Sequence, residues 1–364
     1  MLKKWLSDAS LSTVVAGFVA VLVGFTSSAA IVFSAAQALG ANEAQTASWM
    51  WALGLGMGGT SLVLSLWYRQ PVLTAWSTPG AAVLAVTQGV TLPEATGAFI
   101  VSALLIMGVG YSGLFERWMA RIPLALASAL LAGVLARFAL DAVGAVGQAP
   151  VLVLCMAGSY LLGRRFFSRW AVPCVLAVGM AVAALQGQLN AAQIAWTWAT
   201  PVWVSPEWRW GAMVSVALPL FIVTMASQNL PGVAAQRSAG YNTPISPVIG
   251  ATGCVTLLLA PFGGYALNLA AITAAICMGR EAHADPKRRY TASAVAGLFY
   301  ILLGLAGASI VSLLAAFPKA LVLAVAGLAL VSTIASSLST AMKDEGHRDG
   351  ALLTFLVTLS GLSI

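Results

Sequence analysis

The chain has 364 residues, of which 60% are apolar and 8% are charged, with 18 Lys and Arg against 11 Asp and Glu. Soluble domains carry about 25% charged residues because their surfaces face water. A set of charges this sparse excludes a soluble enzyme, a disordered tail and a fibrous protein, and it indicates a chain that lies mostly in lipid. The net charge of +7 is compatible with nucleic-acid binding only until the positions of the charges are considered.

Apolar runs long enough to cross a bilayer, about 17–25 residues each, follow one another along the chain. They cover residues 12–39, 48–68, 72–91, 95–115, 122–140, 149–163, 171–187, 211–234, 244–260, 261–279, 291–316 and 320–341, and another starts at 350. The first run is too long for the apolar part of a signal peptide. The last run is short where the sequence ends at Ile364, so we expect one more helix that this sequence lacks.

The positions of the basic residues predict the orientation in the membrane. If the N-terminus is cytoplasmic and each run crosses once, all basic residues except Arg137, Arg209 and Lys319 lie on the cytoplasmic side. Short loops with this bias follow the positive-inside rule. The basic charges therefore indicate topology and give no reason to expect a nucleic-acid partner.

Two of the apolar runs are interrupted. Run 72–91 contains Thr74–Ala82 (TAWSTPGAA), and run 261–279 contains Pro261–Asn268 (PFGGYALN), so polar residues, proline and glycine fall at membrane depth in both. Irregular backbone is tolerated there only where it is buried in protein or lines a cavity. Interrupted spans in corresponding places of two halves point to the binding site of a transporter.

The interruptions also predict what the site binds. We expect one helix to start after Pro79-Gly80 and another after Gly263-Gly264. Free N–H groups and the positive dipole ends of two such helices would suit a small anion, such as a carboxylate, without any lysine or arginine. The alternative is a pair of kinks that serve helix packing alone.

Run 211–234 adds a third polar group, with Thr224, Ser227, Gln228 and Asn229 in sequence order. Asparagine and glutamine side chains offer both hydrogen-bond donors and acceptors. We expect them to face the interior of the helix bundle, either at the site or in hydrogen bonds between helices.

Arg137 and Asp141 are spaced i, i+4 near the predicted outer end of run 122–140. An ionisable pair at the edge of a span is a candidate for coupling or gating. A structural ion pair whose charged ends reach the interface is the alternative.

Residues 191–210 carry several tryptophans and form a predicted outer linker between residues 1–190 and 211–364. Tryptophans are typical of the interface between membrane and water. A belt at the level of the lipid headgroups is one interpretation, and a lid over the substrate is the other.

Metal and cofactor chemistry has little support in the sequence. The four cysteines are scattered singly among apolar residues, and the two histidines, His283 and His347, lie in charged loops. We expect no metal site, no cofactor, no catalytic residues and no ATP-binding domain. An enzyme is therefore not expected, and uphill transport would need an ion gradient.

Three stretches carry a resemblance to a known family. Thr74–Ala82, Ser227–Ala234 (SQNLPGVA) and especially Pro261–Ile272 (PFGGYALNLAAI) resemble the bacterial benzoate:proton symporters. That family is related to the nucleobase-cation symporters and the SulP anion transporters. The likeness runs essentially from end to end and includes Asp285–Tyr290.

The resemblance implies an all-α, multi-pass membrane protein with a fold of seven plus seven inverted helices, about 13–14 membrane segments in all. Residues 1–190 would form the first repeat and 211–364 the second. Spans 1–4 and 8–11 would form a core domain and the other spans a gate domain. Spans 3 and 10 would each begin as a short strand and continue as a helix. A bacterial inner membrane, a cytoplasmic N-terminus and a homodimer are further expectations.

The resemblance also implies import of benzoate, or a similar aromatic carboxylate, with protons. The substrate-binding residues would be Ser77, Thr78, Pro79, Gly80, Gln228, Asn229, Gly263, Gly264, Tyr265 and Asn268, with Phe262 against the ring. The nucleobase relatives carry acidic residues in spans 8 and 10, which this sequence lacks. The proton could therefore travel on the substrate carboxylate, whose pKa a dry site raises. The alternatives are a carrier of the same fold for a nucleobase, sulfate or bicarbonate, and an anion channel.

Overall fold

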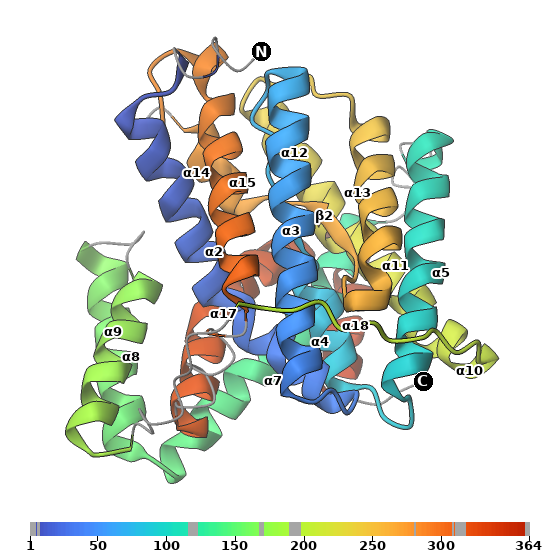
Figure 1. Ribbon diagram of the computed structural model, residues 1–364. Coiled ribbons are helices and arrows are strands. Elements are labelled where there is room, and N and C mark those ends of the chain that lie inside the picture. Colours follow the sequence, from blue (N-terminus) through green and yellow to red (C-terminus); the bar gives the residue numbers. More distant parts are fainter. Residues whose placement is uncertain are drawn as a thin grey trace. The chain divides into compact units, whose positions relative to one another are not determined.

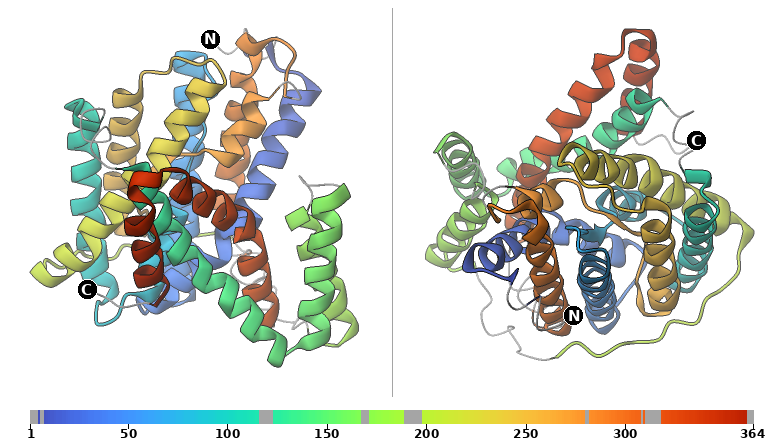
Figure 2. Two further views of the ribbon diagram at one scale, coloured as in Figure 1. Left: turned by 180° about the vertical axis from the view of Figure 1, so that it is seen from behind. Right: turned by 90° about the horizontal axis from the view of Figure 1, so that it is seen from above.

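The computed structural model is shown in Figures 1 and 2, and it describes eight stretches of the chain. By their internal contacts the residues form two compact units. The described residues are 5, 8–115, 123–166, 171–188, 198–279, 282–307, 309 and 318–360. Unit 1 comprises residues 1–22, 36–121 and 197–308, and unit 2 comprises 23–35, 122–196 and 309–364. Apart from residues 23–35 and 309–316, unit 1 gathers the segments expected for the core domain. Each unit takes segments from both 1–190 and 211–364, so the division into these repeats stays a prediction.

Unit 1 contains helices from both ends of the sequence and the two strands. Its elements are α3 (Glu43–Tyr68), β1 (Thr74–Trp76), α4 (Thr78–Val86), α5 (Leu92–Tyr111), α10 (Trp210–Ala212), α11 (Leu218–Thr224), α12 (Leu230–Ser238), α13 (Ile245–Leu259), β2 (Leu267–Leu269), α14 (Ile272–Met278) and α15 (Tyr290–Leu305). The π-helical stretches Met213–Ala217 and Met225–Asn229 join α10, α11 and α12 into one long helix. Helix α2 (Leu11–Ala38) contributes residues to both units.

Local sequence signals set where the helices of unit 1 begin. Asn42 and Gln45 form a capping box at the start of α3, with the Asn42 side chain 2.9 Å from the backbone nitrogen of Gln45. Thr91 and Glu94 form another at the start of α5, where Pro93 occupies the first turn. Each box satisfies two backbone donors that a helix start leaves unpaired.

Glycines bring pairs of helices of unit 1 into close contact. Helix α3 packs on α15 where Gly54 meets Gly304, and α5 packs on α13 where Gly110 meets Gly250. Small residues at such contacts let backbones approach closely, as is common between helices in membranes. Of these helices, α3 contacts both strands and α13 contacts β2, which is labelled between α3 and α13 in Figure 1.

Unit 2 consists of α7 (Leu124–Gly144), α8 (Pro150–Phe166), α9 (Ala171–Leu185), α17 (Lys319–Lys343) and α18 (Arg348–Ser360). Helix α7 packs against α17 and α18, and α8 packs against α9. The contacts are made largely by alanine, such as Ala129 and Ala341, with Leu152 and Met156 filling the space against α9 and α17. Small residues again allow helices to pack closely.

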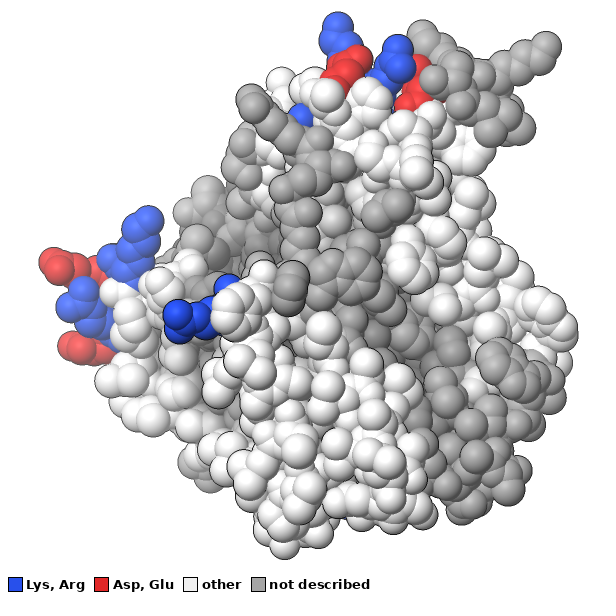
Figure 3. Space-filling view, turned by 90° about the vertical axis from the view of Figure 1, so that its left-hand side faces the viewer, with Lys and Arg blue, Asp and Glu red and all other residues white. Residues whose placement is uncertain are grey.

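Four helices in the described part of the chain are long and apolar enough to cross a membrane. They are Glu43–Tyr68, Leu92–Tyr111, Trp210–Val233 and Ile245–Phe262, which correspond to four of the runs expected from the sequence. The other expected spans stay predictions. On the face shown in Figure 3, the described charged side chains gather in a few small groups and leave broad surface without charge.

The packing of α3 on α15 predicts a difference between two neighbouring glycines. A Cβ on Gly58 would lie 2.5 Å from the carbonyl oxygen of Gly297, whereas a Cβ on Gly59 would meet nothing within 4 Å. Gly58→Ala should therefore destabilise the protein by about 1–3 kcal/mol through overpacking. Gly59→Ala should be neutral or slightly stabilising, because alanine is the better helix former. Thermal unfolding of the purified protein in detergent measures both, and equal melting temperatures would contradict this packing.

Candidate functional site

Two short strands pair inside unit 1. β1 and β2 are antiparallel, with Thr74 opposite Leu269, Ala75 opposite Asn268 and Trp76 opposite Leu267. Every residue of the pair is buried except the half-buried Ala75. Two strands alone are marginally stable at best, so the pair depends on the helices around it.

Side chains of the helices bond to the strand backbone. The N–H of Leu269 donates to Asn229 Oδ1 at 2.9 Å, and the N–H of Leu267 donates to Thr256 Oγ1 at 3.1 Å. On the other strand, the N–H of Thr74 donates to Ser61 Oγ at 3.0 Å. Buried backbone N–H groups need such partners, and the helices thus supply what neighbouring strands supply in a wider sheet.

The start of α4 follows β1 directly. Ser77 is the N-cap, and its hydroxyl accepts from the N–H of Gly80 at 3.1 Å. The helix therefore begins at Thr78, and our expectation of a start after Pro79-Gly80 is wrong, because a proline lacking an N–H fits the first turn. Of the first-turn donors, only the N–H of Thr78 has no hydrogen bond to a described residue.

The π-helical stretch Met225–Asn229 brings the third polar group to the strands. Thr224 Oγ1, just before it, donates to Ser77 Oγ at 2.9 Å, and Asn229, its last residue, bonds to Leu269. A π-helical turn changes the direction of the side chains that follow, and such turns are frequent at functional sites. Ser77, Asn229 and β2 thus lie together, as the sequence predicts.

The turn Gly263–Tyr265 leads into β2. Gly263 has φ +93°, a conformation that favours glycine, and a Cβ there would collide with the ring of Trp49. The N–H of Gly264 donates to the carbonyl of Leu259 at 2.9 Å. The ring of the fully buried Tyr265 has its centre 5.6 Å from that of Trp49 and 5.9 Å from that of Phe99.

The second expected helix start is also wrong. β2 lies between Gly264 and α14, which begins only at Ile272 and has seven residues. The residue before it, Ala271, has no side chain that can cap the helix. The segment therefore offers no dipole end directly after Gly263-Gly264, and the binding of an anion cannot rest on two facing helix ends.

Three polar atoms of this cluster are buried and have no hydrogen-bond partner. They are Ser227 Oγ, the Tyr265 hydroxyl oxygen and Asn268 Oδ1. The Asn268 amide nitrogen, in contrast, lies 3.3 Å from the carbonyl of Ala266. An unsatisfied buried polar group costs about 1–3 kcal/mol, so such groups are rare unless a ligand completes them.

The edge of the cluster is more accessible. Thr78, Gln228 and Phe262 are half-buried, as is Ala75. The Gln228 side chain forms no hydrogen bond with a described residue, and Phe262 already contacts the rings of Trp51 and Trp203. Phe262 is thus less available to a substrate ring than the sequence suggests.

Arg137 and Asp141 belong to α7 of unit 2 and are not part of this cluster. Within the described residues of that helix they form no ion pair with each other, and Asp141 is exposed. Their expected role in coupling or gating stays a prediction.

The sequence reasoning missed the residues that hold β1 in place. Thr60 Oγ1 lies 2.6 Å from Thr74 Oγ1, and Thr74 Oγ1 donates to the carbonyl of Met57 at 3.0 Å. Adjacent hydroxyls at Thr60-Ser61 inside an apolar helix were the available signal, since polar side chains in membrane helices usually face a partner. Trp49 and Phe99 gave no signal, because aromatic residues are common in any apolar run.

The described part of the tryptophan-rich linker, from 198 to 210, is extended and bonded to unit 1. Val202 N–H donates to Ser48 Oγ on α3 at 2.9 Å, and Val204 N–H donates to the carbonyl of Pro261 at 2.8 Å. At its far end Arg209 forms an ion pair with Glu94 at 3.1 Å. Figure 1 shows this stretch, in yellow-green, passing α3 on its way to α10.

The linker's tryptophans point outward. Trp198, Trp203, Trp208 and Trp210 are 74%, 60%, 65% and 83% exposed, which favours the interfacial belt over a lid. Residues 191–197, with Trp196, lie outside the described residues. Among the residues that the structure describes, no three His, Cys, Asp or Glu side chains gather closely enough to hold a metal ion.

Comparisons with known proteins identify the family and agree with the fold. A sequence model of the family described as benzoate membrane transport protein matches residues 7–364. The chain is 48% identical to the inner membrane protein YdcO of Escherichia coli over 97% of its own length and 90% of that protein. It is 40% identical to the benzoate membrane transport protein of Acinetobacter baylyi, covering 100% of this chain and 92% of that one.

Two solved structures share the fold. The transmembrane domain of the cyanobacterial bicarbonate transporter BicA superposes with a TM-score of 0.68 at 15% identity, covering 96% of this chain and 95% of that one. The structure of SLC26A9 gives a TM-score of 0.61 at 13% identity, covering 98% of this chain and 62% of that one. At these identities both likenesses show the fold alone, and the fold agrees with the one expected from the sequence.

The two adjacent amides, Gln228 and Asn229, should differ in stability when they are shortened. Asn229→Ala leaves the buried N–H of Leu269 without its acceptor and should cost about 1–3 kcal/mol. Gln228→Ala removes no hydrogen bond to a described residue and should change stability by less than about 0.5 kcal/mol. Thermal unfolding without substrate compares them, and a Gln228→Ala loss as large as that of Asn229→Ala would show that the contact to β2 is not what holds the strand.

Proposed function

Since this chain belongs to the benzoate membrane transport protein family and is therefore a membrane transporter, we propose that it imports benzoate, or a similar aromatic carboxylate, with protons. The cluster around β1 and β2 is the proposed binding site. The observation that carries the proposal is the set of three buried, unpartnered polar atoms in a cluster whose described residues include no charged side chain.

The chemistry of these atoms suits a carboxylic acid that still carries its proton. The Tyr265 and Ser227 hydroxyls can donate to a carboxyl oxygen, as can the N–H of Thr78. Asn268 Oδ1 can only accept. An ionised carboxylate offers it no hydrogen, whereas the O–H of the protonated acid does.

The surroundings also favour the protonated form. Trp49 and Phe99 pack around Tyr265 and make its environment apolar. Burial in such an environment raises the pKa of a carboxyl group. The substrate itself can then carry the proton, which accounts for transport with protons in a site that lacks the acidic residues of the nucleobase relatives.

Several finer features belong to the same proposal. Alternating access would come from movement of the core bundle against the gate bundle, and Arg137 and Asp141 of α7 are candidates for coupling or gating during that movement. A bacterial inner membrane location, with the N-terminus in the cytoplasm, is supported by the basic loops and by the inner membrane relative. A homodimer stays a prediction from the family resemblance.

Removing the unpartnered atoms should separate transport from stability. Tyr265→Phe and Ser227→Ala each delete one buried hydroxyl that has no partner. The free energy of unfolding should stay equal or rise, because an unsatisfied group is lost. Benzoate uptake into liposomes that contain the purified protein should fall about tenfold or more, since a hydrogen bond to the substrate is lost.

Ser102→Ala is the matched control, because Ser102 Oγ on α5 is also buried without a partner and was not predicted to bind substrate. It should leave uptake within about twofold of the unchanged protein. Normal uptake by Tyr265→Phe and Ser227→Ala together would move the site away from the strand pair.

Counterflow of radiolabelled benzoate tests the substrate class. Liposomes loaded with unlabelled benzoate should accumulate label transiently, and salicylate should compete because it has the same ring and carboxyl group. Uracil, sulfate and bicarbonate should not compete, because none of them combines an aromatic ring with a carboxyl group. Competition by one of these three instead of salicylate would favour another carrier, and the absence of counterflow with rapid equilibration of label would favour a channel. Protein-free liposomes correct for benzoic acid that crosses the lipid unaided.

A further inference from the structure

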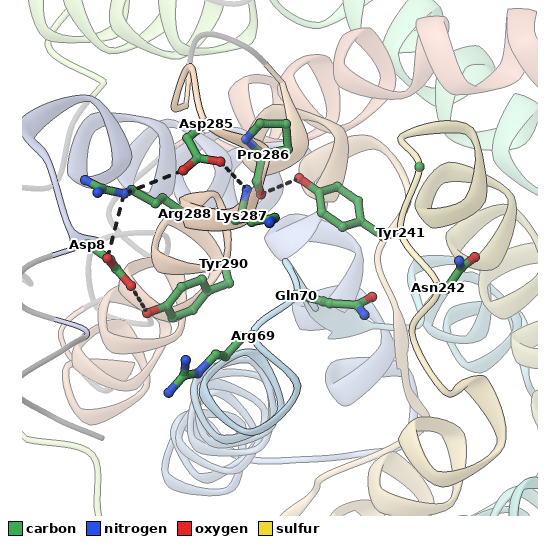
Figure 4. Close-up of a pocket in the computed structure, with 11 residues that line it drawn as sticks. Asp8, Arg69, Gln70, Tyr241, Asn242, Asp285, Pro286, Lys287, Arg288 and Tyr290 are labelled. Atoms are coloured by element: carbon green, nitrogen blue, oxygen red, sulfur yellow. Dashed lines mark hydrogen bonds and ion pairs between the residues drawn. The ribbon is translucent and has the colours of Figure 1, made fainter.

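Unit 1 has a polar cavity, lined by residues outside the strand pair, with a volume of about 570 Å³ (Figure 4). Its walls come from the end of α3, the loop after α12, the loop before α15 and the segment before α2. The lining residues are Asp8, Arg69, Gln70, Gly240, Tyr241, Asn242, Asp285, Pro286, Lys287, Arg288 and Tyr290. These segments include loops that the sequence predicts to be cytoplasmic.

The two carboxylates of the cavity are already engaged. Arg288 Nε lies 3.7 Å from an oxygen of Asp8 and 3.7 Å from an oxygen of Asp285. Asp8 also accepts from the Tyr290 hydroxyl at 2.8 Å, and Asp285 accepts from the N–H of Lys287 at 2.9 Å. Figure 4 marks these interactions on one side of the cavity.

Two cations remain. Arg69 and Lys287 line the cavity and form no ion pair with any residue that the structure describes. Arg69 ends α3 in the left-handed conformation, with φ 51° and ψ 39°. Glycine or asparagine usually takes this place, so an arginine is not what the turn itself requires.

The walls of the cavity are fixed by hydrogen bonds. Arg289 is buried and donates to the carbonyls of Met278 and His283 at 2.8 and 2.7 Å, which holds the loop before α15. Thr243 Oγ1 lies 2.7 Å from Gln70 Oε1 and 2.8 Å from Gln236 Oε1. A cavity with fixed walls needs less ordering when a ligand binds.

The cavity is joined to the strand pair through Gln236. This side chain donates from Nε2 to the carbonyl of Pro71 at 2.8 Å, and Pro71 lies three residues before β1. Its position on α12 also lies two helical turns after Asn229, which bonds to β2. The same two chain segments thus build the cavity and the strand pair.

Two tyrosines give the cavity aromatic surface. Tyr241 and Tyr290 both line it, and Tyr241 donates its hydroxyl hydrogen to the carbonyl of Pro286 at 3.0 Å. Burial raises the pKa of Tyr241, so the phenol stays neutral beside an anion. Aromatic side chains pack well against an aromatic ring, while arginine and lysine bind a carboxylate.

We propose that this cavity is a second, inner binding site for the transported aromatic carboxylate, with Arg69 and Lys287 binding its carboxylate and Tyr241 and Tyr290 its ring. This inner site rests on the proposed function. The substrate is bound here as the anion, in a water-exposed cavity with two cations, whereas the neutral strand-pair site holds the protonated acid. The substrate therefore loses its proton when it moves from the strand-pair site to the inner site.

Transport measured from each face tests the inner site. The protein is reconstituted in liposomes, and those with one or the other face outward are separated by affinity to a tag. Arg69→Gln with Lys287→Gln should raise the half-saturating benzoate concentration about fivefold for transport that starts from the face carrying these residues, since two cation contacts are lost. From the opposite face the value should change less than twofold. High salt should raise the half-saturating benzoate concentration of the wild type at the face that carries these residues. It should leave that of the variant nearly unchanged.

Lys343→Gln with Arg348→Gln is the matched control, because it removes the same charge from the exposed segment around residue 345 in unit 2. It should leave both half-saturating concentrations unchanged. Arg69 and Lys287 are both exposed, so the variant that exchanges them should keep the melting temperature of the wild type. Equal effects at both faces, or the same effect from the control pair, would overturn the inner site alone. If the wild-type protein showed no benzoate counterflow, this result would overturn the proposed function and the inner site with it.

Discussion

The hydrogen bonding of the strand pair is the constraint on which the rest of unit 1 depends. A backbone N–H or carbonyl without a partner is costly where water is absent, and a sheet of two strands leaves its outer groups open. Here Ser61, Thr256 and Asn229 accept from the strand N–H groups. Three different helices must therefore be in place before the strands are satisfied. Close contacts at glycine, such as Gly54 with Gly304, bring the helices near enough.

The same constraint bears on the proposal that the cluster binds a ligand without charged side chains. The polar groups near the strands are mostly used up in holding them, as Asn229 and Ser77 show. Those left over are neutral: Ser227, Tyr265 and Asn268. A neutral, buried set of donors and one acceptor complements a protonated acid better than a bare anion. Charge is instead available at the cavity that Arg69 and Lys287 line, where both side chains are exposed.

Much of this arrangement could be predicted from the sequence. Proline and glycine among polar residues marked Thr74–Ala82 and Pro261–Asn268, and these segments do form the strand pair. Asn229 of the eighth run is buried and bonds to β2, as expected for a side chain facing the bundle interior, whereas Gln228 is half-buried. Such signals are strong because polar residues are costly in an apolar run unless they have partners.

Two features could not be predicted, and each has a physical reason. The helix starts were misplaced, because Ser77 caps α4 from outside and β2 occupies the residues before α14. Caps depend on backbone angles that the residue types alone leave open. The role of Thr60 and Ser61 depends on which helix face meets β1, which requires the tertiary packing.

The proton carried by the substrate is the central claim, and the driving force of transport tests it most directly. Benzoate uptake is measured in liposomes with an imposed pH gradient, acid outside and the membrane potential held at zero, and again with a potential but no pH gradient. Protein-free liposomes and Tyr265→Phe give the background. One proton moving with each benzoate makes transport electroneutral, so the account predicts protein-dependent accumulation with the pH gradient and none with the potential alone. Uptake that ignores the pH gradient, or that the potential alone drives, would contradict it.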